Sequence, residues 1–276
     1  MNVVITGACG GMGYATTKLL KEKGYNIYAG DLYLNNKVEG VKYFNLDVTS
    51  MESCRNFFGF VKKECDELYA IIHFAGIYNM NSLVEISEED FIKIFNINVF
   101  GIYRLNKVFL PLLNKNSRVV ITSSELGPLN PLPFTGLYGI TKSTIEKYAY
   151  SLRMELNLLD IKVSVIRPGA VKTGLLNAST TSIDKFVNET KIYPTMSRKF
   201  KKIVESVETK NISPDKIGKI AYKILKSKKP KYIYNINRNI LLRLLSILPK
   251  RFQVWIIKKN IKIRGIKNES LYKGYN

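Results

Sequence analysis

The sequence is poor in the residues that build disulfide frameworks and metal centres. Its 276 residues include three cysteines, Cys9, Cys54 and Cys65, which are too few and too scattered for a disulfide framework or a zinc site. The single histidine, His73, would have to anchor any histidine-based triad or metal centre, and we interpret it as structural. We therefore expect no resident metal and a reducing, cytoplasmic setting.

Long hydrophobic runs are also missing. No window of about 18 uninterrupted apolar residues occurs, which argues against a membrane-spanning helix. No basic segment followed by a cleavable apolar stretch stands at the start, so we expect no signal peptide. Hydrophobic residues make up 46% and charged residues 24%, a composition typical of a globular protein and too apolar for a disordered one.

Acidic residues are scarce near the C-terminus. The chain has 43 Lys and Arg against 22 Asp and Glu, and from Lys226 to Asn276 fourteen basic residues accompany one acid, Glu269. Apolar and aromatic residues alternate with these cations over 239–259, which favours an in-plane helix on an anionic membrane. The alternatives are packing on the chain's own domain or on a sister subunit. No nucleic-acid motif is present, and we expect no nucleic-acid partner.

Short apolar runs alternate with amphipathic segments along the first two thirds of the chain. This pattern predicts strands over 2–6, 25–29, 41–46, 69–73, 118–122, 162–167 and 231–234, and helices over 11–23, 49–64, 87–113 and 135–158 and from 213. A Thr49–Glu52 capping box would open the second helix. Apolar strands separated by helices indicate an α/β fold, a doubly wound parallel sheet of about seven strands covered on both faces.

A glycine-rich turn, Thr6-Gly7-Ala8-Cys9-Gly10-Gly11-Met12-Gly13, follows the first expected strand. Its glycines let backbone N–H groups approach a pyrophosphate at the start of a helix. Asp31 ends the second strand, where its carboxylate can accept hydrogen bonds from both ribose hydroxyls and would repel the 2′-phosphate of NADP. Asp47 and Val48 are placed to line the adenine pocket. We predict NAD rather than NADP; the alternative is a turn that binds nothing.

Tyr138 and Lys142 lie one helical turn apart and share a face. A lysine cation near the phenol would lower its pKa from about 10, so that it can exchange a proton with an alcohol at neutral pH. Ser124 ends the fifth strand and can hold the substrate oxygen, with Ser123 as a second candidate. Asn98 can carry a water that links Lys142 to solvent. The alternative for the Tyr/Lys pair is a solvated helical face.

In combination, these motifs resemble the classical short-chain dehydrogenase/reductase family over about residues 2–235. The glycine turn, the Tyr138-x-x-x-Lys142 pair with Ser124 and Asn98, and the segment 167–173 match its motifs. The resemblance implies a Rossmann fold and cofactor contacts from Gly7, Gly11, Met12, Gly13, Asp31, Asp47, Val48, Ala75, Gly76, Tyr138, Lys142, Pro168, Gly169, Val171 and Thr173. His73-Phe74-Ala75-Gly76 departs from the Asn-Asn-Ala-Gly of the family.

The resemblance implies NAD(H)-dependent interconversion of a lipophilic alcohol and its ketone or aldehyde. Tyr138 would act as acid/base, Lys142 would lower its pKa and hold the nicotinamide ribose, Ser124 would orient the substrate, and Asn98 would complete a proton relay. The segments 123–126 and 131–134 resemble the retinol and hydroxysteroid dehydrogenase branch. Two alternatives remain: an NADPH-dependent reductase of an acyl or sugar substrate, and a non-catalytic dinucleotide-binding sensor or scaffold.

The expected domain organisation follows from the same matches. Residues 1–235 form the dinucleotide-binding catalytic domain, and 174–212 lie where the family places its substrate-covering loop. Residues 236–276 form a basic amphipathic helical extension, which we expect to contact an anionic membrane peripherally. Relatives are usually dimers or tetramers, so the resemblance implies a homodimer or homotetramer.

Overall fold

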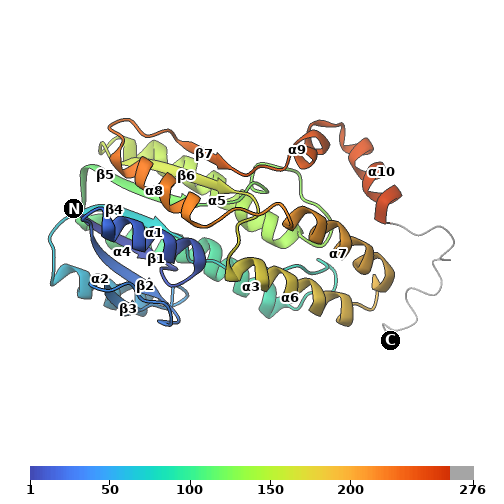
Figure 1. Cartoon of the computed structure of the whole chain (residues 1–276), viewed down its shortest axis with the longest axis horizontal. Helices are drawn as coiled ribbons and strands as arrows, with labels where there is room; N and C mark the ends of the chain where they lie inside the picture. Colours follow the sequence, from blue (N-terminus) through green and yellow to red (C-terminus); the bar gives the residue numbers. More distant parts are fainter. Residues whose placement is uncertain (262–276) are drawn as a thin grey trace.

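The computed structural model describes residues 1–261, without the side chains of 175–180 and 207–208. The end of the expected extension, 262–276, lies outside the described residues. Seven parallel strands form one sheet in the order β3-β2-β1-β4-β5-β6-β7 (Figure 1). They are β1 Asn2–Thr6, β2 Asn26–Asp31, β3 Lys42–Asn45, β4 Leu68–His73, β5 Leu113–Thr122, β6 Lys162–Pro168 and β7 Ile233–Ile236. The predicted α/β class and strand number are confirmed.

Helices connect the strands and cover both faces of the sheet. They are α1 Gly11–Glu22, α2 Met51–Lys62, α3 Glu88–Phe95, α4 Gly101–Phe109, α5 Gly136–Asn157, α6 Gly174–Glu189, α7 Pro194–Glu208, α8 Asp215–Lys226, α9 Ile240–Ile247 and α10 Lys250–Ile261. A π-helical segment, η1 Asn96–Phe100, joins α3 to α4, and a 3₁₀ turn, η2 Leu110–Leu112, follows α4.

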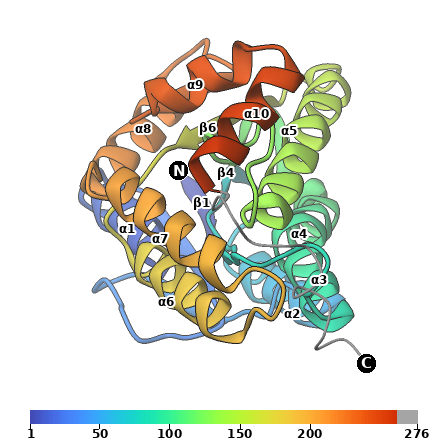
Figure 2. The ribbon, with the colours of Figure 1, turned by 90° about the vertical axis from the view of Figure 1, so that its right-hand side faces the viewer.

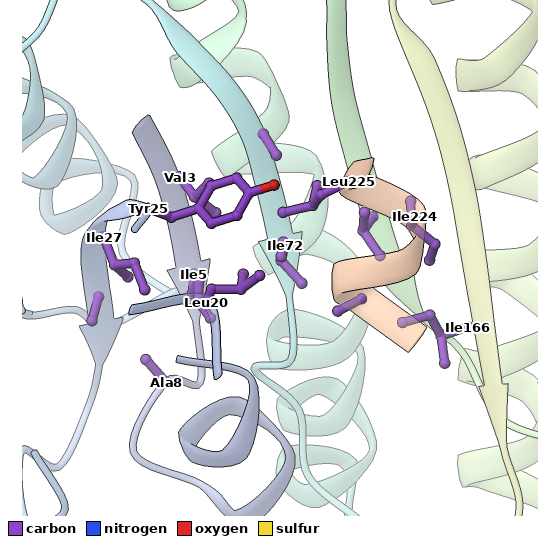
Figure 3. Packing of buried hydrophobic residues seen from close by; sticks show 14 of the residues in the cluster. Val3, Ile5, Ala8, Leu20, Tyr25, Ile27, Ile72, Ile166, Ile224 and Leu225 are labelled. Carbon is purple, nitrogen blue, oxygen red and sulfur yellow. The ribbon is translucent and has the colours of Figure 1, made fainter. Parts of the chain in front are cut away.

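Strand β1 shows why an unbroken apolar run suits the centre of this sheet. Val3, Val4 and Ile5 are all fully buried, because alternate side chains point to opposite faces and each face is covered. Val3 and Ile5 pack with Leu20 of α1 and with α8, as Figure 3 shows. Val4 packs on the other face, in a cluster that includes Phe57 of α2.

Two expected helix boundaries differ from the structure. Helix α2 begins after Ser50, whose hydroxyl accepts a hydrogen bond from the Ser53 N–H at 3.1 Å, so the predicted Thr49–Glu52 capping box is wrong. The reason is Asp47, whose Oδ1 accepts hydrogen bonds from both the N–H and the hydroxyl of Thr49, at 2.8 and 2.7 Å. These bonds hold Thr49 in the turn that precedes the helix.

The long helix expected over 87–113 is present from Glu88 to Leu112, but it is not regular throughout. Ser87 caps α3 as predicted, the helix widens to a π turn around Asn98, and β5 begins at Leu113. The side chain of Asn98 hydrogen-bonds both backbone groups of Ile77, its Oδ1 accepting at 2.8 Å and its Nδ2 donating at 3.0 Å. We attribute the π turn to this two-point attachment, which ties the helix to the loop after β4.

The strand order reverses between β1 and β4, because the chain adds β2 and β3 on one side of β1 and the remaining strands on the other. Ligands of open parallel sheets bind outside the carboxyl ends of the strands at such a reversal. Gly7, Phe74 and Ser123 follow the ends of β1, β4 and β5, so the topology places them at one rim. Helices α6, α7, α9 and α10 gather at this end of the molecule (Figure 1).

Candidate active site

The glycine turn forms a cradle that side chains would block. Gly7 has φ +66°, and a Cβ on it would lie 2.5 Å from the Ala75 nitrogen. A Cβ on Gly13 would lie 2.0 Å from the Gly7 oxygen. No side chain caps α1 at Gly10, and its first turn carries no acidic residue. The N–H groups at this helix start are therefore available to an anion such as a pyrophosphate.

Asp31 lies beside the cradle. Its Oδ2 accepts a hydrogen bond from the Cys9 N–H at 2.8 Å, and its Oδ1 accepts one from the Tyr33 N–H at 3.3 Å. Each carboxylate oxygen can accept a further bond, so both can still receive ribose hydroxyls. These contacts fix the carboxylate in the wall of the cleft that Gly7 and Asp47 also line.

The cleft around the cradle has a volume of ≈ 1050 Å³. This matches the upper end of the usual range for small-molecule sites, ~300–1,000 Å³. Ten of the predicted cofactor residues line it: Gly7, Gly11, Met12, Gly13, Asp31, Asp47, Val48, Ala75, Gly76 and Thr173. The residues present therefore fit a dinucleotide, with a glycine cradle at one end and a carboxylate beside it.

A second, smaller cavity of ≈ 180 Å³ adjoins the cleft and is lined by three of the four predicted catalytic residues, Ser124, Tyr138 and Lys142. Met12, Gly76 and Thr173 line both hollows, so the cavity and the cleft are neighbours. Three further predicted cofactor residues line this cavity: Pro168, Gly169 and Val171. The fourth predicted catalytic residue, Asn98, lines neither hollow.

Tyr138 and Lys142 lie on the first turns of α5, and both are buried. The Ser124 hydroxyl acts on the phenol by lowering the pKa of Tyr138, and both residues line the cavity. The Lys142 Nζ lies 5.5 Å from the centre of the Tyr138 ring and donates a hydrogen bond to the Thr122 oxygen at 3.1 Å. Tyr138 and Lys142 therefore do not belong to a solvated helical face, which was the alternative interpretation.

The pKa of Tyr138 is shifted in the direction opposite to the one expected. Burial raises the pKa of Tyr138 well above its ordinary value, and the Ser124 hydroxyl opposes this only in part. Burial also lowers the pKa of Lys142 to about 8, although the nearby Glu146 carboxylate raises it. Desolvation dominates because the apolar walls disfavour charge on either group. The phenol is therefore in its proton-donating form.

Ser123 and Ser124 are distinguished by their hydrogen bonds. The Ser123 hydroxyl donates to the backbone oxygen of Lys142 at 3.4 Å, which ties β5 to α5. The Ser124 hydroxyl accepts from the Leu126 N–H at 3.2 Å and contacts Tyr138. These contacts favour Ser124 over Ser123 as the residue that meets a substrate oxygen.

Asn98 lies in the π turn and is fully buried. Its Nδ2 also lies 3.3 Å from the Thr141 hydroxyl, next to Lys142 on α5. A Cβ on Gly76 would lie 3.2 Å from Asn98 Oδ1 and 3.9 Å from Lys142 Nζ, so both groups lie close to the Gly76 backbone. The side chain is occupied by protein partners, which indicates that it acts by positioning.

His73 lies outside both hollows. It is buried at the end of β4, and its Nε2 lies 2.9 Å from the Asn106 Oδ1. The Asn106 Nδ2 in turn donates to the Tyr148 hydroxyl at 3.1 Å. Burial lowers the pKa of His73 to about 4. The chain of bonds links β4, α4 and α5, in agreement with the structural interpretation.

The segment 174–212, expected as a covering loop, consists of the helices α6 and α7. Phe186 packs in a small core with Phe134 and Phe200, with the Phe134 and Phe186 ring centres 4.8 Å apart. Among the side chains that the structure describes in this segment, those of Phe200, Ile203 and Val204 on α7 line the cavity. Phe186 of α6 therefore supports the cover, and α7 supplies part of the wall.

Several cavity residues were not predicted from the sequence. Phe74, Met80 and Leu242 add apolar surface from segments far apart in the chain. Glu125 is a buried carboxylate, whose Oε2 accepts a hydrogen bond from the Asn239 N–H at 2.6 Å. Burial raises its pKa. The pattern of the sequence carries no signal for these contacts, because they depend on where α9 and the loop after β4 pack.

A family model described as short chain dehydrogenase matches residues 1–184. This chain belongs to the short-chain dehydrogenase family. It is therefore a short-chain NAD(P)-dependent dehydrogenase/reductase, an oxidoreductase acting on alcohol and ketone groups. Among the residues that the structure describes, no helix has the length and apolarity needed to cross a bilayer.

Three similar proteins place the short-chain dehydrogenase among its relatives. It is 28% identical to a 3-ketodihydrosphingosine reductase of Bacteroides thetaiotaomicron over 231 residues, 83% of this chain and 85% of that protein. It is 28% identical to estradiol 17-beta-dehydrogenase 2 of Mus musculus over 187 residues, 63% of this chain but only 49% of that protein. A short-chain dehydrogenase/reductase from Burkholderia phymatum in complex with NAD shares the fold, with a TM-score of 0.74, 18% identity, and coverage of 92% and 94%.

Proposed function

We propose that this dehydrogenase interconverts a lipophilic alcohol and its ketone or aldehyde with NAD(H). One observation carries the proposal: the Tyr138 phenol meets the Ser124 hydroxyl where an apolar cavity joins a cleft suited to a dinucleotide. A non-catalytic sensor or scaffold would not require a phenol and a hydroxyl buried together where the cavity meets the cleft. The proposal therefore favours an enzyme over the non-catalytic alternative.

The bound dinucleotide would supply or accept the hydride, and the chain's own residues would handle the proton. Ser124 holds the substrate oxygen, and Tyr138 donates a proton to it in the direction of reduction or accepts one in oxidation. Lys142 holds the nicotinamide ribose, and its cation, when charged, favours the phenolate. Asn98 holds the loop after β4 against α5, which fixes the positions of Tyr138 and Lys142 relative to that loop.

The cavity lining supports a lipophilic substrate. Beyond the catalytic groups, its walls consist largely of apolar side chains from four parts of the chain: Phe74, Met80, Leu126, Leu132, Phe200, Ile203, Val204 and Leu242. The two named relatives carry names that refer to a keto sphingoid base and a steroid. Both comparisons favour a lipid alcohol or ketone over a sugar or a small acyl group.

NAD is proposed over NADP because of Asp31. Its carboxylate is held in the cleft wall by the Cys9 and Tyr33 N–H groups, where a ribose 2′-phosphate would meet a negative charge. Association into a homodimer or homotetramer stays a prediction from the family. We also propose that the C-terminal helices make peripheral contact with an anionic membrane.

The test is Tyr138→Phe, with NADH oxidation followed across steroid, retinoid and long-chain ketones. Loss of the phenolic proton donor should abolish turnover, while NADH binding, measured by its own fluorescence, should stay nearly unchanged. Tyr150→Phe is the matched control, because Tyr150 is an exposed tyrosine on the same helix. Turnover retained by Tyr138→Phe would refute the role given to this residue.

A further inference from the structure

Helices α9 and α10 expose an unusual amount of apolar surface. On α9 the exposed side chains are Ile240, Leu241, Leu244, Ile247 and Leu248, and on α10 they are Phe252, Val254 and Trp255. Leu241 is 75%, Ile247 77% and Trp255 58% exposed. Single exposed apolar residues are ordinary, whereas a contiguous set on consecutive helices marks an interaction surface. We name these eight residues the apolar ridge.

The ridge lies on the outward faces of both helices. On α9, Leu242 points into the substrate cavity, and Leu244 and Ile247 follow at spacings that turn them to the opposite side. On α10, Ile257 and Ile261 pack against the core beneath α7, which leaves Trp255 outward. Figure 2 looks onto this end, with α9 and α10 beside α7.

The two helices that carry the ridge have cations and no acid of their own. Residues 240–261 contain Arg243, Lys250, Arg251, Lys258 and Lys259 and no Asp or Glu. The Lys259 ammonium lies 5.1 Å from the centre of the Trp255 ring. A second copy of the chain, meeting this face by a two-fold contact, would set these cations against themselves. An anionic lipid surface would neutralise them and bury the apolar side chains.

We propose that α9 and α10 dock on an anionic membrane and that the docked face opens the substrate cavity toward the lipid. Leu242 of α9 and Ile203 of α7 both line the cavity, and Ile203 is also exposed at the surface. Ile203 thus marks where the proposed opening would lie, between α7 and the ridge. A lipid alcohol or ketone passes there without crossing water; this second part rests on the proposed function.

The chain's single tryptophan, Trp255, reports on docking directly. Its emission should shift to shorter wavelength and lose acrylamide quenching when vesicles of phosphatidylglycerol and phosphatidylcholine are added, and much less with phosphatidylcholine alone. An unchanged emission with the anionic vesicles overturns the proposal. So does a shift that appears without vesicles and grows with protein concentration, because a second copy would then cover the ridge.

Matched variants test where the membrane binds. Lys258→Gln with Lys259→Gln should weaken binding to anionic vesicles roughly 30-fold, because each cation near such a surface contributes about a factor of five. Lys228→Gln with Lys229→Gln removes the same charge before the amino end of β7, whereas α9 follows its carboxyl end, and should leave binding nearly unchanged. Equal losses in both variants would show a general charge effect and overturn the assignment.

A second pair of variants tests the apolar contribution. Leu244→Ser with Ile247→Ser should weaken binding, whereas Leu158→Ser with Leu159→Ser, which changes two exposed leucines after α5, should not. Circular dichroism checks that each variant is folded. Equal binding by both pairs would overturn the role of the ridge, and the lysine variants provide the same test should a serine variant fail to fold.

The entry route is tested by comparing two ketones, one short and water-soluble and one long-chain and held in anionic vesicles. The Lys258→Gln, Lys259→Gln variant should keep NADH oxidation with the soluble ketone and lose most of it with the vesicle-held ketone. Equal effects on both ketones overturn the route. Absence of turnover with every ketone overturns the proposed function and the route with it, but leaves the tryptophan result on docking intact.

Discussion

Acid should destabilise this protein through its one histidine. His73 is 2% exposed, and burial lowers its pKa to about 4 in the folded chain, against 6.5 when it is free. Between these values the unfolded chain binds a proton that the folded chain does not. The stability that comes from the neutral imidazole is therefore present above pH 6.5 and is lost as the pH falls through about 4.

The size of the effect follows from the two pKa values. Lowering the pH from about 7 to about 5 should reduce the free energy of unfolding by roughly 2 kcal/mol through this group alone. Urea unfolding followed by circular dichroism measures the total pH dependence. His73→Gln keeps a hydrogen-bonding partner for Asn106 but cannot titrate, so the difference between the two pH profiles isolates the histidine.

The imidazole can also be observed directly, because no other histidine contributes a signal. Its proton resonance in the folded protein should stay in the neutral position down to about pH 5. A midpoint near 6.5 would refute the argument, since it would show that the ring is solvated or paired with a charge. Identical pH profiles for wild type and His73→Gln would refute it as well.

Two further changes test the cofactor and catalytic sides of the site. Asp31→Ala should weaken NADH binding roughly 30-fold, because about 2 kcal/mol of charge-assisted hydrogen bonding is lost. It should also reduce discrimination against NADPH in a fluorescence titration. An unchanged preference for NADH would show that Asp31 does not bind the ribose. Glu146→Gln should cost about 2–3 kcal/mol of stability in urea, because the largely buried Arg167 guanidinium, whose nitrogens lie 2.8 and 2.6 Å from the carboxylate, would keep only a neutral partner. The same change should lower the pKa of Lys142 further below about 8, so that loss of activity at alkaline pH begins earlier, and a profile that does not move would contradict this coupling.

The fold was predictable because each strand has a recognisable apolar pattern within its own short segment of sequence. Val3 to Ile5 are apolar in sequence and fully buried in the structure, and the glycines after them stand where backbone atoms approach most closely. The spacing from Gly13 to Asp31 likewise reflects one helix–strand unit. The spacing from Tyr138 to Lys142 reflects one helical turn. Short-range geometry of this kind can be recognised in a sequence without knowledge of the rest of the fold.

What the sequence did not reveal depends on long-range packing. The π turn at Asn98 arises from bonds to Ile77, twenty-one residues away, and the pKa of Tyr138 depends on how completely the surrounding segments exclude water. The family resemblance predicted a covering loop over 174–212, whereas the structure forms α6 and α7 there. Leu242 could not be assigned to the cavity, because only the fold of α9 brings it there.

The packing of α10 against α7 links the C-terminal helices to the wall of the cavity. Ile257 and Ile261 support the same small core as Phe200, and Phe200 forms part of the cavity wall. Mutations near the chain's end should therefore alter which molecules are accepted, even though they lie far in sequence from any reacting atom. Diversification of such termini would give this scaffold a means of changing its substrate without changing its chemistry.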